Sequence, residues 1–337
     1  MDSKRLQGAN FIVIARKWFP IASHTRFRQI RGGLASSNWA FRYRGKTYML
    51  KRLTRYITKH DILFEYRITN YIRESGFGYA VPRIILSNEG LPFTKVGRNL
   101  YSVYEYIEGE SGKNINVAYA TEIGAMIADL HSIIESYRFG KAKKRRGYHT
   151  IEMLKKRFYN SKRLFEGKSN KISEACMRSY SWFFSEIKKI DLGYYNSLKA
   201  YALHEDISQE NIIWKNGKIA ALIDFSNIGR YRNPFLMDLA WAVHFCCKSK
   251  PQGRYSMHLI SALLKGYRGK RAITRNDAKA LVSLIILVEA ATLESSYIIS
   301  SKVGQMEGLK LVLRHIDAAK WLISNRTGVE NTIVGWT

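Results

Sequence analysis

The period of the hydrophobic pattern changes about a third of the way along the chain, and this change constrains the fold more than any other feature. Residues 26–53 alternate apolar or aromatic side chains with small or basic ones, which predicts three short strands. Two more strands are expected at Arg83–Leu86 and Leu100–Tyr106, and a helix at about Lys59–Arg73. This pattern predicts a β-rich N-terminal lobe over residues 1–107.

After two glycines, Gly109 and Gly112, the apolar residues recur at helical spacing. Helices are expected at Tyr119–Ile134, Ser173–Lys189, Phe235–Cys247, Tyr255–Tyr267, Arg275–Ile299 and Met306–Ser324. A β-rich island, Ala202–Ile223, interrupts them with short strands around a polar loop and a hairpin turn at Asn216-Gly217. Residues 108–337 therefore predict a larger, mainly α-helical C-terminal lobe, and the whole chain an α+β fold.

Composition places the chain among folded globular proteins, since 46% of its 337 residues are hydrophobic. Its 55 Lys and Arg residues outnumber 27 Asp and Glu residues, which gives a net charge of +28. An anionic partner (phosphate ligand, nucleic acid or membrane surface) is one explanation, and a general bias of composition is another. The densest basic cluster, Lys141–Arg146, fits a solvated connector or a nucleic-acid patch.

No transmembrane segment is expected, because the most apolar stretch, Leu281–Leu293, is too short to span a bilayer and contains Glu289. The N-terminal residues lack the apolar core of a secretion signal, and the three cysteines form no disulfide framework. These features predict a protein of the reducing cytoplasm. The pattern leaves its oligomeric state open.

The polar loop of the β-rich island carries residue types that phosphoryl transfer needs. That reaction uses a carboxylate to orient the attacking hydroxyl, and hard oxygen ligands for the Mg²⁺ on the phosphates. Asp206 is the predicted catalytic carboxylate, while Asn211 and Asp224 are the predicted metal ligands. The loop and the following hairpin are expected to bring these three residues to one end of a small sheet. His204 is expected to brace the loop by hydrogen bonds.

The predicted N-terminal lobe has a turn of small residues that lets backbone N–H groups approach phosphates, although an ordinary hairpin turn has the same sequence. The turn residues predicted to contact the nucleotide are Gly32, Gly33, Ser36 and Ser37. Lys51, in an apolar strand, can reach the α- and β-phosphates if a carboxylate on the next helix holds it. Glu65 is the expected partner, and Glu74, near the helix end, is the alternative.

The pattern His204-x-Asp206-x4-Asn211, followed by Asp224-Phe225-Ser226, resembles the catalytic centre of the aminoglycoside phosphotransferase and choline kinase superfamily. Further segments that resemble this superfamily in the same order are Tyr104–Glu110, Ile123–His131, Pro234–Ala240 and Gly266–Arg268. The likeness extends from about residue 26 to residue 325, which is nearly the whole chain.

The resemblance implies a two-lobed, protein-kinase-like fold and transfer of the γ-phosphate of ATP, with Mg²⁺, to a hydroxyl group. It implies that a strand lysine pairs with a helix glutamate, here Lys51 and Glu65. Adenine is expected at the hinge, against backbone groups of Glu105, Tyr106 and Ile107. Asp238 is expected to support the catalytic loop.

One position departs from the superfamily, since Glu205 stands where its members usually have glycine. A side chain there can alter the loop geometry or substrate access, and its charge can raise the pKa of Asp206. Neither effect removes a catalytic atom.

The resemblance leaves the acceptor open, because the superfamily phosphorylates aminoglycosides, choline, homoserine and other hydroxyl compounds. Polycationic aminoglycosides need an acidic pocket, whereas the predicted helical lobe is poor in acids and rich in Lys and Arg. A neutral or anionic acceptor is therefore expected. The alternatives are an aminoglycoside-type resistance kinase and a catalytically weak or inactive kinase-fold binding or coat protein.

Overall fold

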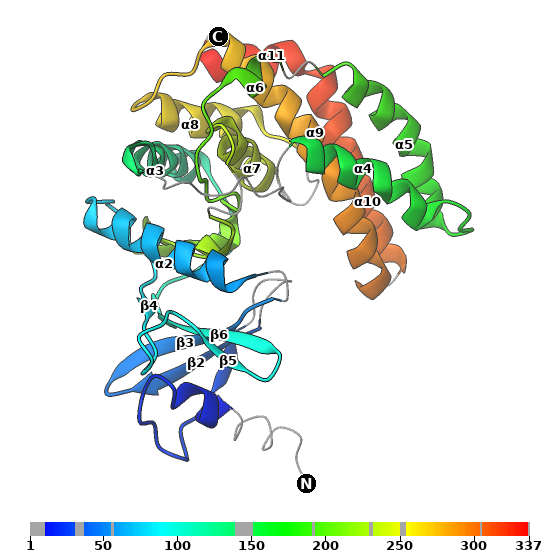
Figure 1. The fold of residues 1–337 in the computed structure, drawn as a ribbon. Coiled ribbons are helices and arrows are strands. Elements are labelled where there is room, and N and C mark those ends of the chain that lie inside the picture. The colour runs from blue at the N-terminus through cyan, green and yellow to red at the C-terminus, as the bar shows by residue number, and fades with distance from the viewer. Residues whose placement is uncertain are drawn as a thin grey trace. The chain divides into compact units, whose positions relative to one another are not determined.

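The structure is a computed structural model. It describes residues 11–30, 37–54, 57–138, 151–190, 193–228, 232–249, 254–303 and 305–335. Two compact units make up the chain, and Figure 1 shows the sheet in one and most of the helices in the other. The first unit comprises Met1–Lys113 and Glu210–Gly229, and the second comprises Asn114–Gln209 and Arg230–Thr337. The predicted boundary between lobes at residue 107 stays a prediction, and the basic cluster Lys141–Arg146 lies outside the described residues.

An antiparallel sheet of six strands forms the described core of the first unit, in the order β1-β2-β3-β6-β4 with β5 paired to β6. The strands are β1 (Arg28–Ile30), β2 (Ser37–Tyr43), β3 (Lys46–Arg52), β4 (Ile84–Ile85), β5 (Thr94–Val96) and β6 (Asn99–Glu105). The three strands expected within residues 26–53 are confirmed, as are the two expected later. β5 was not predicted, because three residues are too few to show a period.

The two faces of this sheet have different neighbours. Phe41, Tyr48 and Leu50 point to one face, where they pack against Ile14 and Trp18 in a buried cluster. Lys51 and every second residue before it in β3 lie on the other face.

Helix α2 (Lys59–Glu74) starts with a capping box. The Thr58 hydroxyl accepts from the Asp61 N–H, and the Asp61 carboxylate accepts from the Thr58 N–H.

A two-stranded hairpin, β7 (Ile212–Lys215) and β8 (Lys218–Leu222), belongs to the first unit although it lies far along the chain. Its predicted turn is confirmed, with positive φ at both Asn216 (52°) and Gly217 (76°). Backbone hydrogen bonds of 2.8–2.9 Å join Trp214 to Glu110, which fixes the hairpin to the segment that follows the sheet.

The second unit is helical in its described residues. Its helices are α3 (Val117–Ser136), α4 (Ile151–Phe165), α5 (Lys171–Lys188), α6 (Gly193–Ser197), α7 (Leu236–Cys246), α8 (Met257–Arg268), α9 (Arg275–Val303), α10 (Gln305–Ser324) and α11 (Arg326–Val334). All six helices predicted for this half are confirmed to within a few residues at each end. The structure adds α4, α6 and α11 to them.

Two helices, α3 and the Arg275–Ile298 part of α9, are long and apolar enough to cross a membrane by length and composition alone. The apolar stretch of α9 is thus longer than Leu281–Leu293. The protein interior buries 50% of the apolar window in α3 and 78% of that in α9. Burial of this kind is typical of core helices.

Helices α3 and α8 cross at two glycines that leave no room for a side chain. A Cβ atom added to Gly124 would lie 1.8 Å from the Leu263 carbonyl oxygen, and one added to Gly266 would lie 1.9 Å from that of Thr121. Both contacts are to backbone, which cannot turn away as a flexible side chain can. The two glycines therefore set the distance between the helices.

The change Gly266→Ala is expected to push α8 away from α3 and to lower the free energy of unfolding by about 1–3 kcal/mol or more. Chemical denaturation measures the effect. Gly269→Ala on the same helix end is the control, because its added Cβ atom would meet its nearest neighbour at 3.5 Å, an ordinary contact. Equal stability of the two variants would contradict the close approach.

A buried carboxylate joins α7, α9 and α10. The Glu289 side chain accepts from Lys248 Nζ at 2.5 Å, from the Tyr255 hydroxyl, and at 2.9–3.0 Å contacts His244 Nδ1 and His315 Nδ1. The two histidines and Glu289 are residue types that bind metals. The Lys248 ammonium, however, contacts the same carboxylate oxygen as His244, so the cluster is a buried ion pair with hydrogen-bonded histidines.

Acid is expected to weaken this cluster. Burial and the Lys248 charge lower the pKa of His244 to about 4. In the unfolded chain this histidine binds a proton near pH 6.5, whereas in the folded protein it stays neutral until the pH approaches 4. Burial opposes ionisation of Glu289, but Lys248 and the histidines outweigh it and hold its pKa well below the usual range. Both shifts remove stability as the pH falls.

We expect the free energy of unfolding to drop between pH 6.5 and pH 4, with His244 contributing up to about 1.4 kcal/mol per pH unit. Denaturation curves at pH 7 and pH 5 should show a smaller drop for His244→Gln than for the wild type. His258→Gln, on the exposed side of α8, is the control and should keep the wild-type drop.

Candidate active site

An ion pair of the first unit joins strand β3 to the end of the hairpin. Lys51 is 3% exposed, and its Nζ donates to Asp224 Oδ1 at 2.7 Å. Asp224 follows β8 and has a left-handed backbone (φ 61°), and its carboxylate also accepts from the Ser226 N–H at 3.4 Å. The local turn therefore directs the Asp224 carboxylate to Lys51.

Helix α2 brings a second carboxylate to this place. Glu65 is buried and accepts from the Tyr104 hydroxyl at 3.1 Å. Burial raises the pKa of Glu65 to about 7, while the Lys51 charge lowers it and the Asp224 charge raises it. The structure thus gathers Lys51, Glu65 and Asp224, with the 2.7 Å ion pair of Lys51 going to Asp224. Glu74, the alternative partner, is exposed at the end of α2.

The predicted metal ligands Asn211 and Asp224 lie at the two ends of the hairpin. The Asn211 carbonyl accepts from the Ile223 N–H at 2.9 Å, so these ends adjoin each other. An amide oxygen and a carboxylate are hard ligands, and Mg²⁺ commonly completes its coordination with water and phosphate oxygens. The donor set therefore fits Mg²⁺, and the assignment of both residues stays a prediction.

The loop with the predicted catalytic Asp206 belongs to the second unit, where a buried carboxylate holds its backbone. Asp238, on α7 and 0% exposed, accepts from the N–H groups of Glu205 at 2.7 Å and His204 at 3.3 Å. The buried ring of His204 accepts from the Asp206 N–H through Nδ1 at 3.3 Å. These contacts are the ones that a bracing role for His204 and Asp238 requires.

Sequence reasoning did not foresee how Asp238 itself is held. A further partner is His131 of α3, whose Nε2 lies 3.1 Å from the carboxylate while its Nδ1 lies 3.0 Å from the Tyr267 hydroxyl of α8. Burial lowers the pKa of His131, although Asp238 opposes that shift. The available signals are the Leu130-His131 and Gly266-Tyr267 pairs, which resemble the superfamily in sequence but do not by themselves show a contact with Asp238.

The predicted nucleotide-contacting backbone is only partly described. Gly32, Gly33 and Ser36 lie outside the described residues, while Ser37 begins β2 and accepts from Arg52 Nη2 at 3.0 Å. At the predicted hinge, the Glu105 N–H donates to the Arg83 carbonyl and the Tyr106 N–H to the Thr47 carbonyl. These two N–H groups are thus already paired, and a base contact by the backbone of Glu105, Tyr106 and Ile107 stays a prediction.

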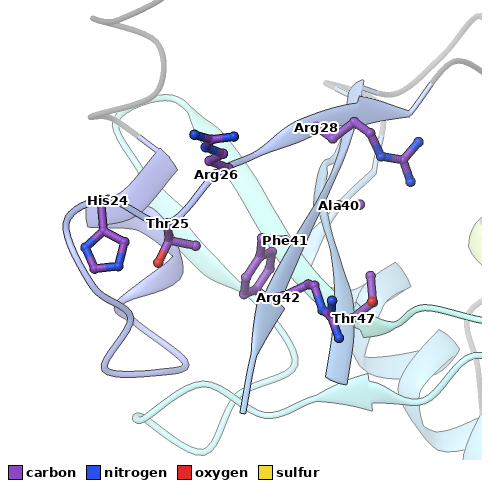
Figure 2. A pocket seen from close by; sticks show the side chains of 8 residues that line it. All are labelled: His24, Thr25, Arg26, Arg28, Ala40, Phe41, Arg42 and Thr47. Atoms are coloured by element: carbon purple, nitrogen blue, oxygen red, sulfur yellow. The ribbon is translucent and has the colours of Figure 1, made fainter. Parts of the chain in front are cut away.

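A hollow in the first unit is lined by residues of β1, β2 and β3 and of the segment just before β1, and Figure 2 shows these side chains. The register pairs Arg28 with Ala40 and Arg42 with Thr47, and directly paired residues share a face. By the same register this is the Lys51 face. Arg28 and Arg42 thus add positive charge beside the predicted nucleotide region, and sequence reasoning missed both.

Comparisons with known proteins bear on the family and the fold of the chain. The sequence model of the phosphotransferase enzyme family matches residues 26–273. A homoserine kinase of Chelativorans sp. strain BNC1 is 21% identical over 265 residues, which is 78% of this chain and 77% of that protein. A microcompartment-associated aminopropanol kinase superposes with a TM-score of 0.70 at 14% identity, covering 100% of both chains.

An amicoumacin kinase in complex with AMP-PNP and Ca²⁺ has a TM-score of 0.66 at 15% identity, over 95% of this chain and 93% of that one. Likeness at this level of identity establishes the fold. The predicted two-lobed, protein-kinase-like α+β fold is therefore confirmed.

The change Lys51→Met is expected to abolish most of the thermal stabilisation that ATP with Mg²⁺ gives, because a buried cation opposite phosphates is lost. Any ATP turnover should fall on the order of 10²–10³-fold. Lys46→Met is the matched control, since Lys46 is an exposed lysine on the same strand. An unchanged thermal shift in Lys51→Met would remove Lys51 from the nucleotide site.

Proposed function

The chain belongs to the phosphotransferase enzyme family, and on this premise we propose that it transfers the γ-phosphate of ATP to a hydroxyl group of a small neutral or anionic molecule. The predicted superfamily and the predicted class of enzyme, a small-molecule kinase, are confirmed. The observation that carries the proposal is the buried Lys51 paired with Asp224 beside Glu65.

In the proposed reaction, the acceptor hydroxyl gives its proton to the Asp206 carboxylate as its oxygen bonds to the γ-phosphorus. The bond from that phosphorus to the β–γ bridging oxygen breaks, and ADP leaves. Lys51 binds the α- and β-phosphates. Asn211 and Asp224 offer the oxygen ligands for Mg²⁺, which when bound neutralises charge on the phosphates.

The acceptor is proposed from chemistry and from the relatives together. A homoserine kinase acts on a hydroxy amino acid, which carries both an ammonium and a carboxylate group. A chain with a net charge of +28 favours an acceptor with a carboxylate or with no charge over a polycation. A small hydroxy amino acid or related hydroxyl compound is therefore our first choice.

The location of the protein in the cell is also a proposal. We place the protein in the cytoplasm, where ATP and Mg²⁺ are supplied and its buried cysteines stay reduced. A further anionic partner, suggested by the net charge, and the oligomeric state are separate questions that the kinase proposal does not require.

A screen of hydroxyl acceptors tests the proposal. Purified protein with ATP and Mg²⁺ is given homoserine, aminopropanol, choline, a hexose and an aminoglycoside, and ADP formation is measured. We expect turnover with a small neutral or zwitterionic acceptor, and a fall on the order of 10²–10⁴-fold in Asp206→Asn. Asp317→Asn, an exposed aspartate on α10, is the control and should keep full turnover.

Other outcomes favour the alternatives. Turnover with the aminoglycoside alone would indicate a resistance kinase. Thermal stabilisation by ATP and Mg²⁺, with no acceptor giving turnover above Asp206→Asn, would indicate a kinase-fold binding or coat protein.

A further inference from the structure

Glu205 combines two features that each cost free energy. Its backbone is left-handed, with φ of 60°, a conformation that a residue with a side chain rarely adopts. Its carboxylate is buried, with 1% of the residue exposed, where an ionised group needs donors. A glycine would avoid both costs. Strain that a fold retains at such a place points to a function.

The carboxylate of Glu205 is tied to a rigid neighbour. Its Oε1 accepts a short hydrogen bond from Asn233 Nδ2. Asn233 in turn accepts from the Tyr195 hydroxyl at 3.3 Å, and its backbone exchanges two 2.9 Å hydrogen bonds with Tyr201. Asn233 is itself 3% exposed. The Glu205 side chain is thus anchored to a buried position that two other segments hold.

The backbone of Glu205 is anchored on the opposite side. Its N–H donates to Asp238 Oδ1 at 2.7 Å, and Asp238 is fixed on α7. Since Glu205 directly precedes Asp206, its φ and ψ angles set the direction in which the chain enters Asp206. Fixing both the N–H and the side chain of one residue leaves that direction little freedom.

We propose that Glu205 is a positioning residue, whose carboxylate, held by Asn233, locks the left-handed turn that orients Asp206 toward the acceptor hydroxyl. A glycine there would lack the tie to Asn233 and could adopt more backbone conformations. The role of Asp206 rests on the proposed kinase function, whereas the locking of the turn does not.

The role predicts a specific order among variants. In Glu205→Gln the amide oxygen can still accept from Asn233, so the turn stays locked. In Glu205→Gly the backbone is relieved of strain but the tie to Asn233 is lost, and in Asn233→Ala the same tie is lost from the other end. Asn216→Gly is the matched control, because it relieves a left-handed residue (φ 52°) at the exposed hairpin turn.

Amide hydrogen exchange of the peptide that spans residues 203–208 tests the locking directly, without turnover. We expect faster exchange in Glu205→Gly and Asn233→Ala, and wild-type exchange in Glu205→Gln and Asn216→Gly. Unchanged exchange in Glu205→Gly, or equal acceleration in Glu205→Gln, would overturn the proposal. If the wild-type protein gave no turnover, the kinase function would be refuted. The hydrogen-exchange result would still test the locking of the turn, because it does not depend on turnover.

With an acceptor found in the screen above, turnover separates positioning from simple structural support. Glu205→Gly should lower kcat on the order of 10–10²-fold, with the thermal shift by ATP and Mg²⁺ retained. The kcat of Glu205→Gln should stay within a few-fold of the wild-type value. The double variant of Asn233→Ala and Glu205→Gly should show no larger fall in kcat than either single variant. Two outcomes would contradict a shared tie. One is a fall in kcat of the double variant equal to the product of the two single falls, and the other is a fall in Glu205→Gln as large as that in Glu205→Gly.

Discussion

Burial of carboxylates is the constraint on which much of this structure depends, because each buried acid must be supplied with donors before its burial is tolerable. Glu65 in the first unit has the Tyr104 hydroxyl and the charge of Lys51. Asp238 and Glu289 in the second unit take their donors from helices and loops far apart in the sequence. Each carboxylate thereby fixes the relative positions of the elements that supply it.

Asp238 shows how such a constraint becomes a means of organising chemistry. It accepts from two successive N–H groups, those of His204 and Glu205, which can both point at one carboxylate only if the chain turns sharply. The φ and ψ angles of His204 set the relative direction of these two N–H groups, and the left-handed Glu205 follows directly. The buried Asp238 carboxylate thus holds the backbone immediately before the strained residue that leads into Asp206.

The sequence predicted the elements whose hydrophobic period is long and regular, such as β2, β3, α3 and α9. It missed α4, although that helix has 15 residues. It also missed α11, where Gly328 and several β-branched residues weaken the helical signal, the five-residue α6 and the three-residue β5. Of the site, the sequence paired Lys51 with Glu65 and grouped Asp224 with Asp206 and Asn211. The ion pair of Lys51 with Asp224 was not predicted. The sequence also did not show that Arg28 and Arg42 share the face of Lys51, because strand register depends on long-range pairing that one sequence does not display.

The expected pair of Lys51 with Glu65 and the observed pair of Lys51 with Asp224 are connected through charge. Burial and the negative charge of Asp224 both oppose ionisation of Glu65, whereas the positive charge of Lys51 favours it. A divalent cation held by Asp224 would cancel that repulsion and would also compete with Lys51 for the carboxylate. Lys51 would then be left to Glu65 and to phosphate oxygens. In the proposed function, Asp224 would therefore set how strongly Lys51 is available to the nucleotide, because Lys51, Glu65 and Asp224 interact as three charges at one place.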